Sequence, residues 1–138
     1  MSEADVRAAL ATAAATVSGL RANGYMPDNI QVPMAVVLPT PFDPRLVEAG
    51  TKTEHEYEMV LFTARAPGEA SQKLLDSYCE LSGATSVIAA IAASTGLNGA
   101  NGGTYADYAQ VTEVSGLEIT PNNGVEYLTR KLTIEVVF

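Results

Sequence analysis

The alternation of polar and apolar side chains in residues 54–65 constrains the fold of this chain more than any other feature. Successive side chains of a β-strand point to opposite faces of its sheet, so this alternation predicts a strand. One face would carry Glu54, Glu56 and Glu58. The other face would carry His55, Tyr57, Met59 and Leu61. Because Val60 and Phe62 make both faces apolar farther on, we expect the strand to begin at an exposed rim and run into the core.

The first segment has the pattern of an amphipathic helix that Ser2 can cap. Apolar side chains recur there at intervals of three and four residues, at Val6, Leu10, Ala13 and Val17. A glycine adopts the left-handed conformation that often ends a helix at little cost, so we expect the helix to end at Gly19 or to continue to Asn23–Gly24.

Two extended segments follow this helix. Residues 20–26 are expected to form a short strand that ends at Pro27. Residues 34–38 are apolar on both sides and lie between prolines, which predicts a strand in the interior of the sheet.

Two helices are expected in the middle of the chain. The first covers residues 67–81, and its inward side chains would be Leu74, Leu75, Tyr78 and Leu81. The second, shorter helix lies within residues 82–94 and would be capped by a serine or threonine, for which Thr85 is the candidate. The residues expected to anchor it are Val87, Ile88 and Ile91.

Two strands are expected at the end of the sequence, over residues 108–119 and 125–138, joined by a hairpin turn at Asn123–Gly124. In the second, one face would carry mainly Leu128, Leu132, Ile134, Val136 and Phe138. Grouped helices among runs of antiparallel strands predict an α+β fold in a single domain, residues 1–138. The sheet would be mixed but mostly antiparallel, with the N-terminal helix and the two central helices packed mainly on one face.

Two segments lack a clear period and are predicted to be loops. Residues 39–54 contain several prolines and charges, and long loops in compact domains often contact partners. The candidate interface residues in this loop are Phe42, Asp43, Arg45, Glu48 and Lys52. Residues 96–109 are rich in Gly and Asn but lack the lysine and the spacing of a phosphate-binding loop.

The charge and composition exclude several classes of function. The net charge is −8 and the pI about 4.5, and the scattered basic residues form no patch that would bind nucleic-acid phosphates. No apolar run approaches the roughly 18 residues that a membrane span needs, and the first residues do not resemble a signal peptide. We therefore expect a soluble protein made in the cytoplasm. A lone cysteine, Cys79, is expected to be a small buried hydrophobe.

Catalytic and metal-binding patterns are weak. His55 is the single histidine, and a lone histidine beside glutamates is more typical of a surface residue or a mild pH-sensitive contact than of a catalytic base. No GxSxG motif is present, and His55 would point away from the face of Glu54, Glu56 and Glu58. The sequence therefore predicts a non-enzymatic protein with no cofactor, whose function depends on its surfaces.

Three stretches taken together resemble the tail terminator proteins of long-tailed bacteriophages. They are residues 1–39, residues 53–91 and residues 122–138, which contain the GVEYL strand. The resemblance is specific because of the order and spacing of these stretches, which together span most of the chain.

The resemblance implies a subunit that closes into a six-membered ring on the head-proximal end of the tail tube. Such a ring stops tube polymerisation and joins the filled head, so the implied partners are further copies of the chain, the tube protein and a head-completion or connector protein. It also implies a place in the virion at the head–tail junction, after assembly in the host cytoplasm, with DNA passing through the channel without specific binding. Alternatives are a head-closure or head–tail connector protein, or a small-molecule-binding domain or enzyme.

The side of the predicted strand that carries Glu54, Glu56 and Glu58 has three interpretations within this family. It would line the channel and repel DNA, contact basic residues of a neighbouring subunit, or face solvent. A head-to-tail ring also needs two different, complementary surfaces on each subunit, which loops and strand edges can supply.

Overall fold

The computed structural model describes residues 3–40, 54–66, 68–94 and 108–137. The helices are α1 (Glu3–Ala15), α3 (Gly68–Tyr78) and α4 (Val87–Ala92). The strands are β1 (Arg21–Asn23), β2 (Met34–Pro39), β3 (Glu54–Ala64), β4 (Tyr108–Val114), β5 (Glu118–Asn122) and β6 (Val125–Val137). The fold is α+β, as the sequence predicts.

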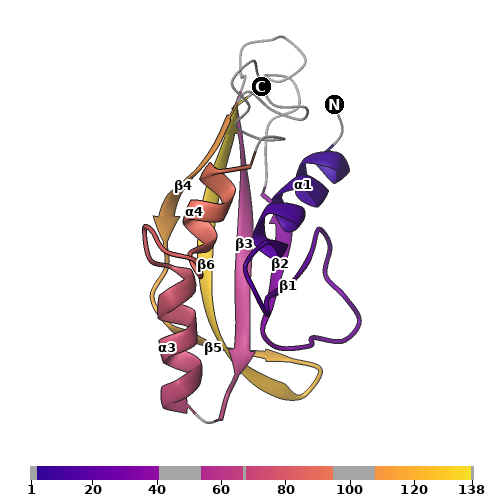
Figure 1. Ribbon diagram of the computed structural model, residues 1–138. Coiled ribbons are helices and arrows are strands. Elements are labelled where there is room, and N and C mark those ends of the chain that lie inside the picture. The colour runs from indigo at the N-terminus through magenta and orange to yellow at the C-terminus, as the bar shows by residue number, and fades with distance from the viewer. Residues whose placement is uncertain (1–2, 41–53, 67, 95–107, 138) are drawn as a thin grey trace.

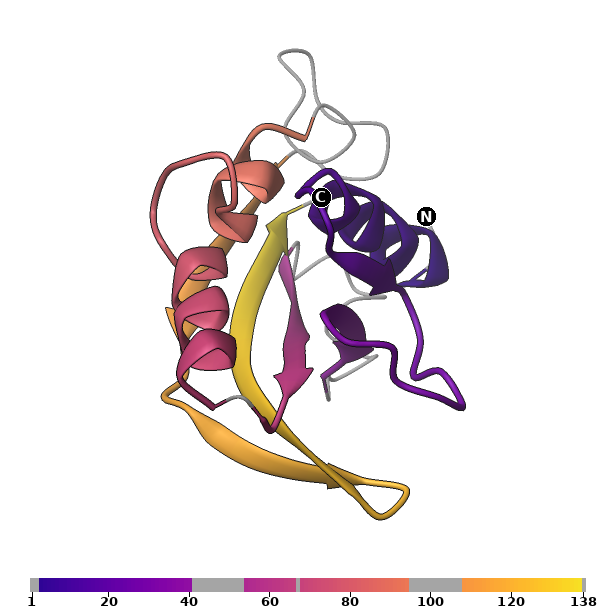
Figure 2. The same cartoon turned by 60° about the horizontal axis from the view of Figure 1, so that its bottom comes forward.

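One six-stranded sheet organises the described residues, in the order β1-β2-β3-β6-β4, with β5 also paired to β6 (Figure 1). Among the described strands, only β1 and β2 pair in parallel. The 13-residue strand β6 pairs with β3 along one edge and with β4 and β5 in succession along the other. The β5–β6 hairpin extends away from the helices (Figure 2).

The three helices cover one face of the sheet and form the main core with it (Figures 1 and 2). The predicted inward side chains of the first helix are buried, but α1 ends at Ala15, before either predicted end, and Gly19 has a positive φ of +81° in the turn that follows. From the sheet, Tyr57, Met59 and Leu61 point into this core. The alternation in β3 therefore predicted the correct face.

The opposite face of the sheet, which we call the open face, carries no helix among the described residues. Its apolar half consists of Met34, Val36, Val60 and Phe62, which pack against Ile30 and Val32 of the β1–β2 connection. Two side chains hold that connection in place. Arg7 Nε donates to Gly24 O at 3.0 Å, and Asn123 Nδ2 donates to Asp28 O at 3.0 Å.

Several predictions about the central helices were wrong. Leu75 and Tyr78 are buried, but α3 ends at Tyr78, so Leu81 lies beyond the helix and is 84% exposed. Leu74 lies one residue from Leu75, about 100° around the helix, and is also exposed. Helix α4 is capped by Ser86, whose hydroxyl oxygen accepts from the Ala89 N–H at 3.0 Å, and not by Thr85.

The strand predicted over residues 108–119 is two strands. They separate at residues 115–117, where Ser115 pairs with Lys131 through its backbone and its side chain, each at 2.8 Å. The predicted turn at Asn123–Gly124 is confirmed, and both residues have positive φ. The predicted strand over residues 20–26 is confirmed in a shorter form, and β2 lies inside the sheet as expected.

Candidate assembly surface

The second half of the open face is acidic. Strand register places Glu56 of β3 directly opposite Glu135 of β6, and Glu58 opposite Thr133. Strand β4 continues these two rows with Gln110 opposite Glu135 and Glu113 opposite Thr133. Cross-strand partners point to the same side of a sheet, so the carboxylates of Glu56, Glu58, Glu113 and Glu135 belong to one surface, which we call the acidic face.

The described carboxylates of the acidic face place like charges close together. Side chains directly opposite each other in an antiparallel pair lie about 4.5–5.5 Å apart at Cβ, and like charges there are destabilising. Glu56 and Glu113 are exposed, whereas Glu58 and Glu135 are half-buried. Lys131 lies in the adjoining cross-strand row, opposite Val60, and its Nζ lies 4.0 Å from the carboxylate of Glu118. The four glutamates therefore make the described part of this face acidic.

The structure brings together part of the predicted site. Glu56 and Glu58 share one face, as predicted. Glu54 begins β3 and pairs with Val137, but its side chain lies outside the described residues. The predicted interface residues Phe42, Asp43, Arg45, Glu48 and Lys52 also lie outside the described residues.

The prediction did not include Glu113 and Glu135. The signal for Glu135 was present, because this residue lies between the inward side chains of Ile134 and Val136 and must point the other way. No local signal marks Glu113, since its face follows from a register shift between Val111 and Glu113.

His55 lies beneath the acidic face on the helix side of the sheet. It is only 6% exposed, so the expectation of a surface histidine was wrong. Its ring packs against the buried ring of Tyr57 at a centroid distance of 4.9 Å. The described residues contain no group of three or more His, Cys, Asp or Glu side chains placed to hold a metal ion. Within the same ranges, every helix is too short or too polar to cross a bilayer.

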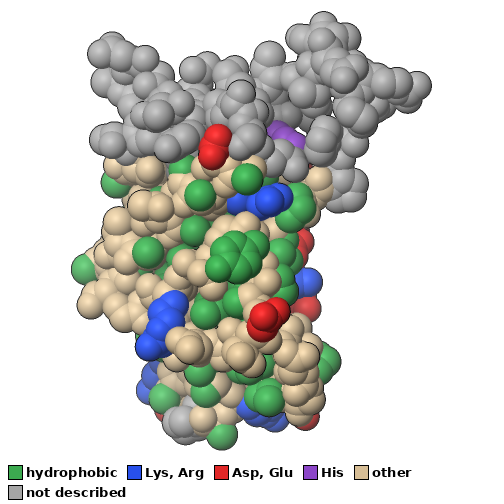
Figure 3. Space-filling model, turned by 90° about the vertical axis from the view of Figure 1, so that its right-hand side faces the viewer, with side chains coloured by type: hydrophobic (Ala, Val, Ile, Leu, Met, Phe, Trp, Pro, Cys, Tyr) green, Lys and Arg blue, Asp and Glu red, His purple; other side chains and the backbone are tan. Residues whose placement is uncertain are grey.

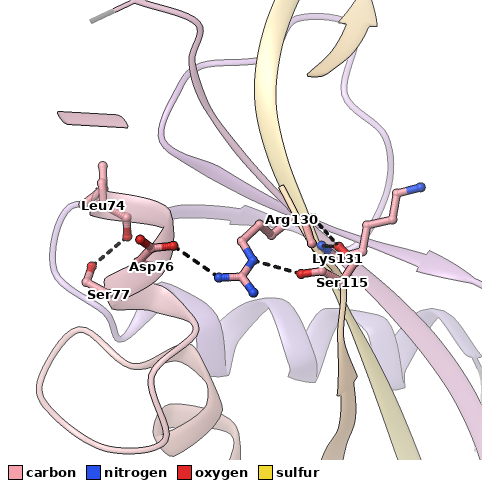
Figure 4. A network of polar contacts seen from close by, with 7 residues as sticks. Leu74, Asp76, Ser77, Ser115, Arg130 and Lys131 are labelled. Atoms are coloured by element: carbon pink, nitrogen blue, oxygen red, sulfur yellow. Dashed lines mark hydrogen bonds and ion pairs between the residues drawn. The ribbon is translucent and has the colours of Figure 1, made fainter. Parts of the chain in front are cut away.

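A polar network connects α3 to the junction of β4 and β5 (Figure 4). Arg130 donates from Nε to Ser115 O at 2.9 Å and from Nη1 to Asp76 Oδ1 at 3.3 Å. Cys79 is half-buried beside this network rather than fully buried as expected. Burial raises the pKa of the Cys79 thiol, and the positive charge of Arg130 opposes part of that rise. A raised thiol pKa disfavours the reactive thiolate.

A comparison with models of known protein families and with curated protein sequences gave no match.

Proposed function

We propose that this chain is a structural subunit that caps the head-proximal end of a long phage tail tube as a ring. In that role it ends tube polymerisation and forms the surface that joins the head. The order and spacing of the three stretches described in the sequence support this proposal. The acidic face supports it independently.

The observation that carries the proposal is the cross-strand pair of Glu56 and Glu135. The pairing holds two carboxylates close together on one face of the sheet, so that negative charge is concentrated there. A ring whose subunits turn this face inward would surround DNA with negative charge. Phosphates are repelled by such a surface, and DNA would slide through it without binding. Carboxylates contributed by β3, β4 and β6 serve this purpose because the sheet holds them on one side.

The test begins with deletion of the gene in the phage that encodes the chain. Abnormally long, headless tails are the expected result, and wild-type protein supplied in trans restores tails of normal length. Electron microscopy of the purified protein mixed with tail tubes should show a ring on one tube end. Binding to the portal without binding to tubes would identify a head-closure or connector protein instead.

A separate test addresses the lumen role, by which we mean that the acidic face lines the channel of the ring. It uses charge reversal, Glu56→Lys combined with Glu135→Lys. The variant should still form rings, but DNA ejection should be slower than with wild-type protein. A matched control is Glu80→Lys, which reverses an exposed charge on a loop away from the sheet. Normal ejection with the double variant would reject the lumen role.

A further inference from the structure

The two outer edges of the sheet carry side chains of opposite charge at the two ends of one cross-strand row. One cross-strand row of the open face runs from Arg21 through Met34, Phe62 and Thr129 to Glu118. Arg21 begins the edge strand β1, and Glu118 begins the edge strand β5. Both side chains are exposed. A basic group and an acidic group therefore stand at opposite ends of one row, on the same face.

The same two edges also carry most of the exposed large apolar side chains of the described residues. Leu117 and Ile119 flank Glu118 and are 43% and 50% exposed. Tyr25 and Met26 follow β1 and are 66% and 44% exposed. Figure 3 views the molecule from the side on which α1 and β1 lie in Figure 1, and hydrophobic side chains reach the surface there between scattered charges. Such side chains beside unpaired strand edges are typical of protein contacts.

Strand direction makes the two edges compatible. β1 is parallel to β2, β2 is antiparallel to β3, and β6 is antiparallel to both β3 and β5. β1 and β5 of one sheet therefore run in opposite directions. A second copy rotated about an axis parallel to the strands would present its β1 to β5 in an antiparallel arrangement, with the open faces on the same side. The alternative two-fold arrangement would bring together two edges of like charge.

We propose that the β1 edge of one copy pairs with the β5 edge of the next, with Arg21 facing Glu118. This contact is heterologous, and repeated rotation closes a ring when the rotation per copy divides a full turn evenly. The inference rests on the proposed function in one respect, which is that the copies close into a ring. It does not depend on the position of that ring on a tail. Because β1 has only three residues, the side chains contribute most of the contact.

Disulfide trapping tests the contact directly. In a Cys79→Ala background, Arg21→Cys and Glu118→Cys are combined in one chain. The two positions lie four strand spacings apart, roughly 19 Å, which is too far for a disulfide within one chain. Oxidation should give a ladder of linked oligomers on non-reducing gels, whereas each single-cysteine variant stops at dimers. In the matched control, Arg21→Cys is combined with Lys73→Cys on α3, and no ladder should form.

Charge exchange gives a second test by sedimentation or native mass spectrometry. Arg21→Glu alone and Glu118→Arg alone should each weaken self-association roughly five-fold or more, as expected when an attractive surface pair becomes repulsive. The double exchange should restore association. Unchanged association in the single variants, or a wild-type chain that stays monomeric at its highest soluble concentration, overturns the inference.

The outcomes separate this inference from the proposed function. If gene deletion gives long headless tails but the cysteine ladder is absent, the edge contact fails and the proposed function stands. If the ladder forms but deletion leaves tail length normal, the proposed function fails and the edge contact stands.

Discussion

At the scale of single residues, the main finding is the direct pairing of Glu56 with Glu135 across β3 and β6. The alternation of side chains predicts which face each glutamate occupies. It does not predict that the two face each other, because register depends on pairing between segments far apart in sequence. The prediction therefore placed the acidic side chains on one strand, whereas the structure places them on three strands.

Removing one charge of this pair should stabilise the protein. We predict that Glu56→Gln raises the free energy of unfolding by about 0.2–1 kcal/mol, because the amide keeps the shape of the side chain without the repulsion. Urea denaturation at neutral pH measures the change. The control Glu80→Gln removes an exposed carboxylate outside the sheet and should have little effect. A loss of stability in Glu56→Gln would contradict the interpretation of the pair as unfavourable.

Burial raises the pKa of the Cys79 thiol above 9.0 and that of the Tyr78 hydroxyl above 10.0. Both groups are neutral when protonated, so the folded state holds these protons more tightly than the unfolded state. Their contribution to stability is fully present below the unfolded pKa values and is lost as pH rises through the folded ones. We predict that the free energy of unfolding falls as pH rises above about 9, where the unfolded thiol and then the unfolded phenol ionise.

Urea titrations across this range measure the effect. A Tyr78→Phe, Cys79→Ala double variant lacks both groups and should show a smaller fall. An equal fall in this variant would assign the pH dependence to other groups.

At the scale of elements, most helices and strands could be predicted from local patterns. Alternation identified β3, and the Asn123–Gly124 turn identified the β5–β6 hairpin. The errors occurred where a distant contact decides the local structure. Residues 115–117 interrupt a pattern that alternates well, because Ser115 is held by Lys131 and Arg130. Leu81 fits the helical spacing of Leu74 and Tyr78 but follows the last helical residue.

The approach of α1 to the end of β1 depends on a glycine. A Cβ built on Gly24 would lie 3.1 Å from the backbone N of Ala8 and 3.1 Å from the backbone carbon of Arg7. We predict that Gly24→Ala lowers the free energy of unfolding by about 1–3 kcal/mol, because backbone atoms of α1 must move. Thermal or urea denaturation measures this. Gly116→Ala is the matched control, since its Cβ would meet nothing within 4 Å, and a similar loss there would show that the contact with α1 is not the cause.

At the scale of the whole molecule, one layer of helices covers one face of a single sheet, and the second face is divided between an apolar and an acidic half. Composition and element order predicted the layers. The division of the open face was not predictable, because Ile30 and Val32 come from a segment without a secondary-structure signal. Arg130 connects the two layers, since it extends from β6 to Asp76 on α3.

Loss of this connection should weaken the whole fold. We predict that Arg130→Met lowers the free energy of unfolding by about 1–3 kcal/mol, because Ser115 O loses a charged donor while the apolar stem is kept. Asp76→Asn is the control, because it weakens the ion pair and leaves the contact with Ser115 in place. Denaturation curves of equal midpoint for Arg130→Met and wild type would show that the network does not contribute.

The position of β6 in the chain has a consequence for biosynthesis. The strands β3, β4 and β5 all pair with β6, and the ribosome makes all three before it. Until β6 emerges, β3 has only β2 beside it, and β5 has no strand to pair with. The nascent chain therefore cannot present the β5 edge as part of the sheet, and Glu56 does not yet face Glu135. Under the proposed edge contact, copies translated side by side on one messenger RNA would join only after each has folded.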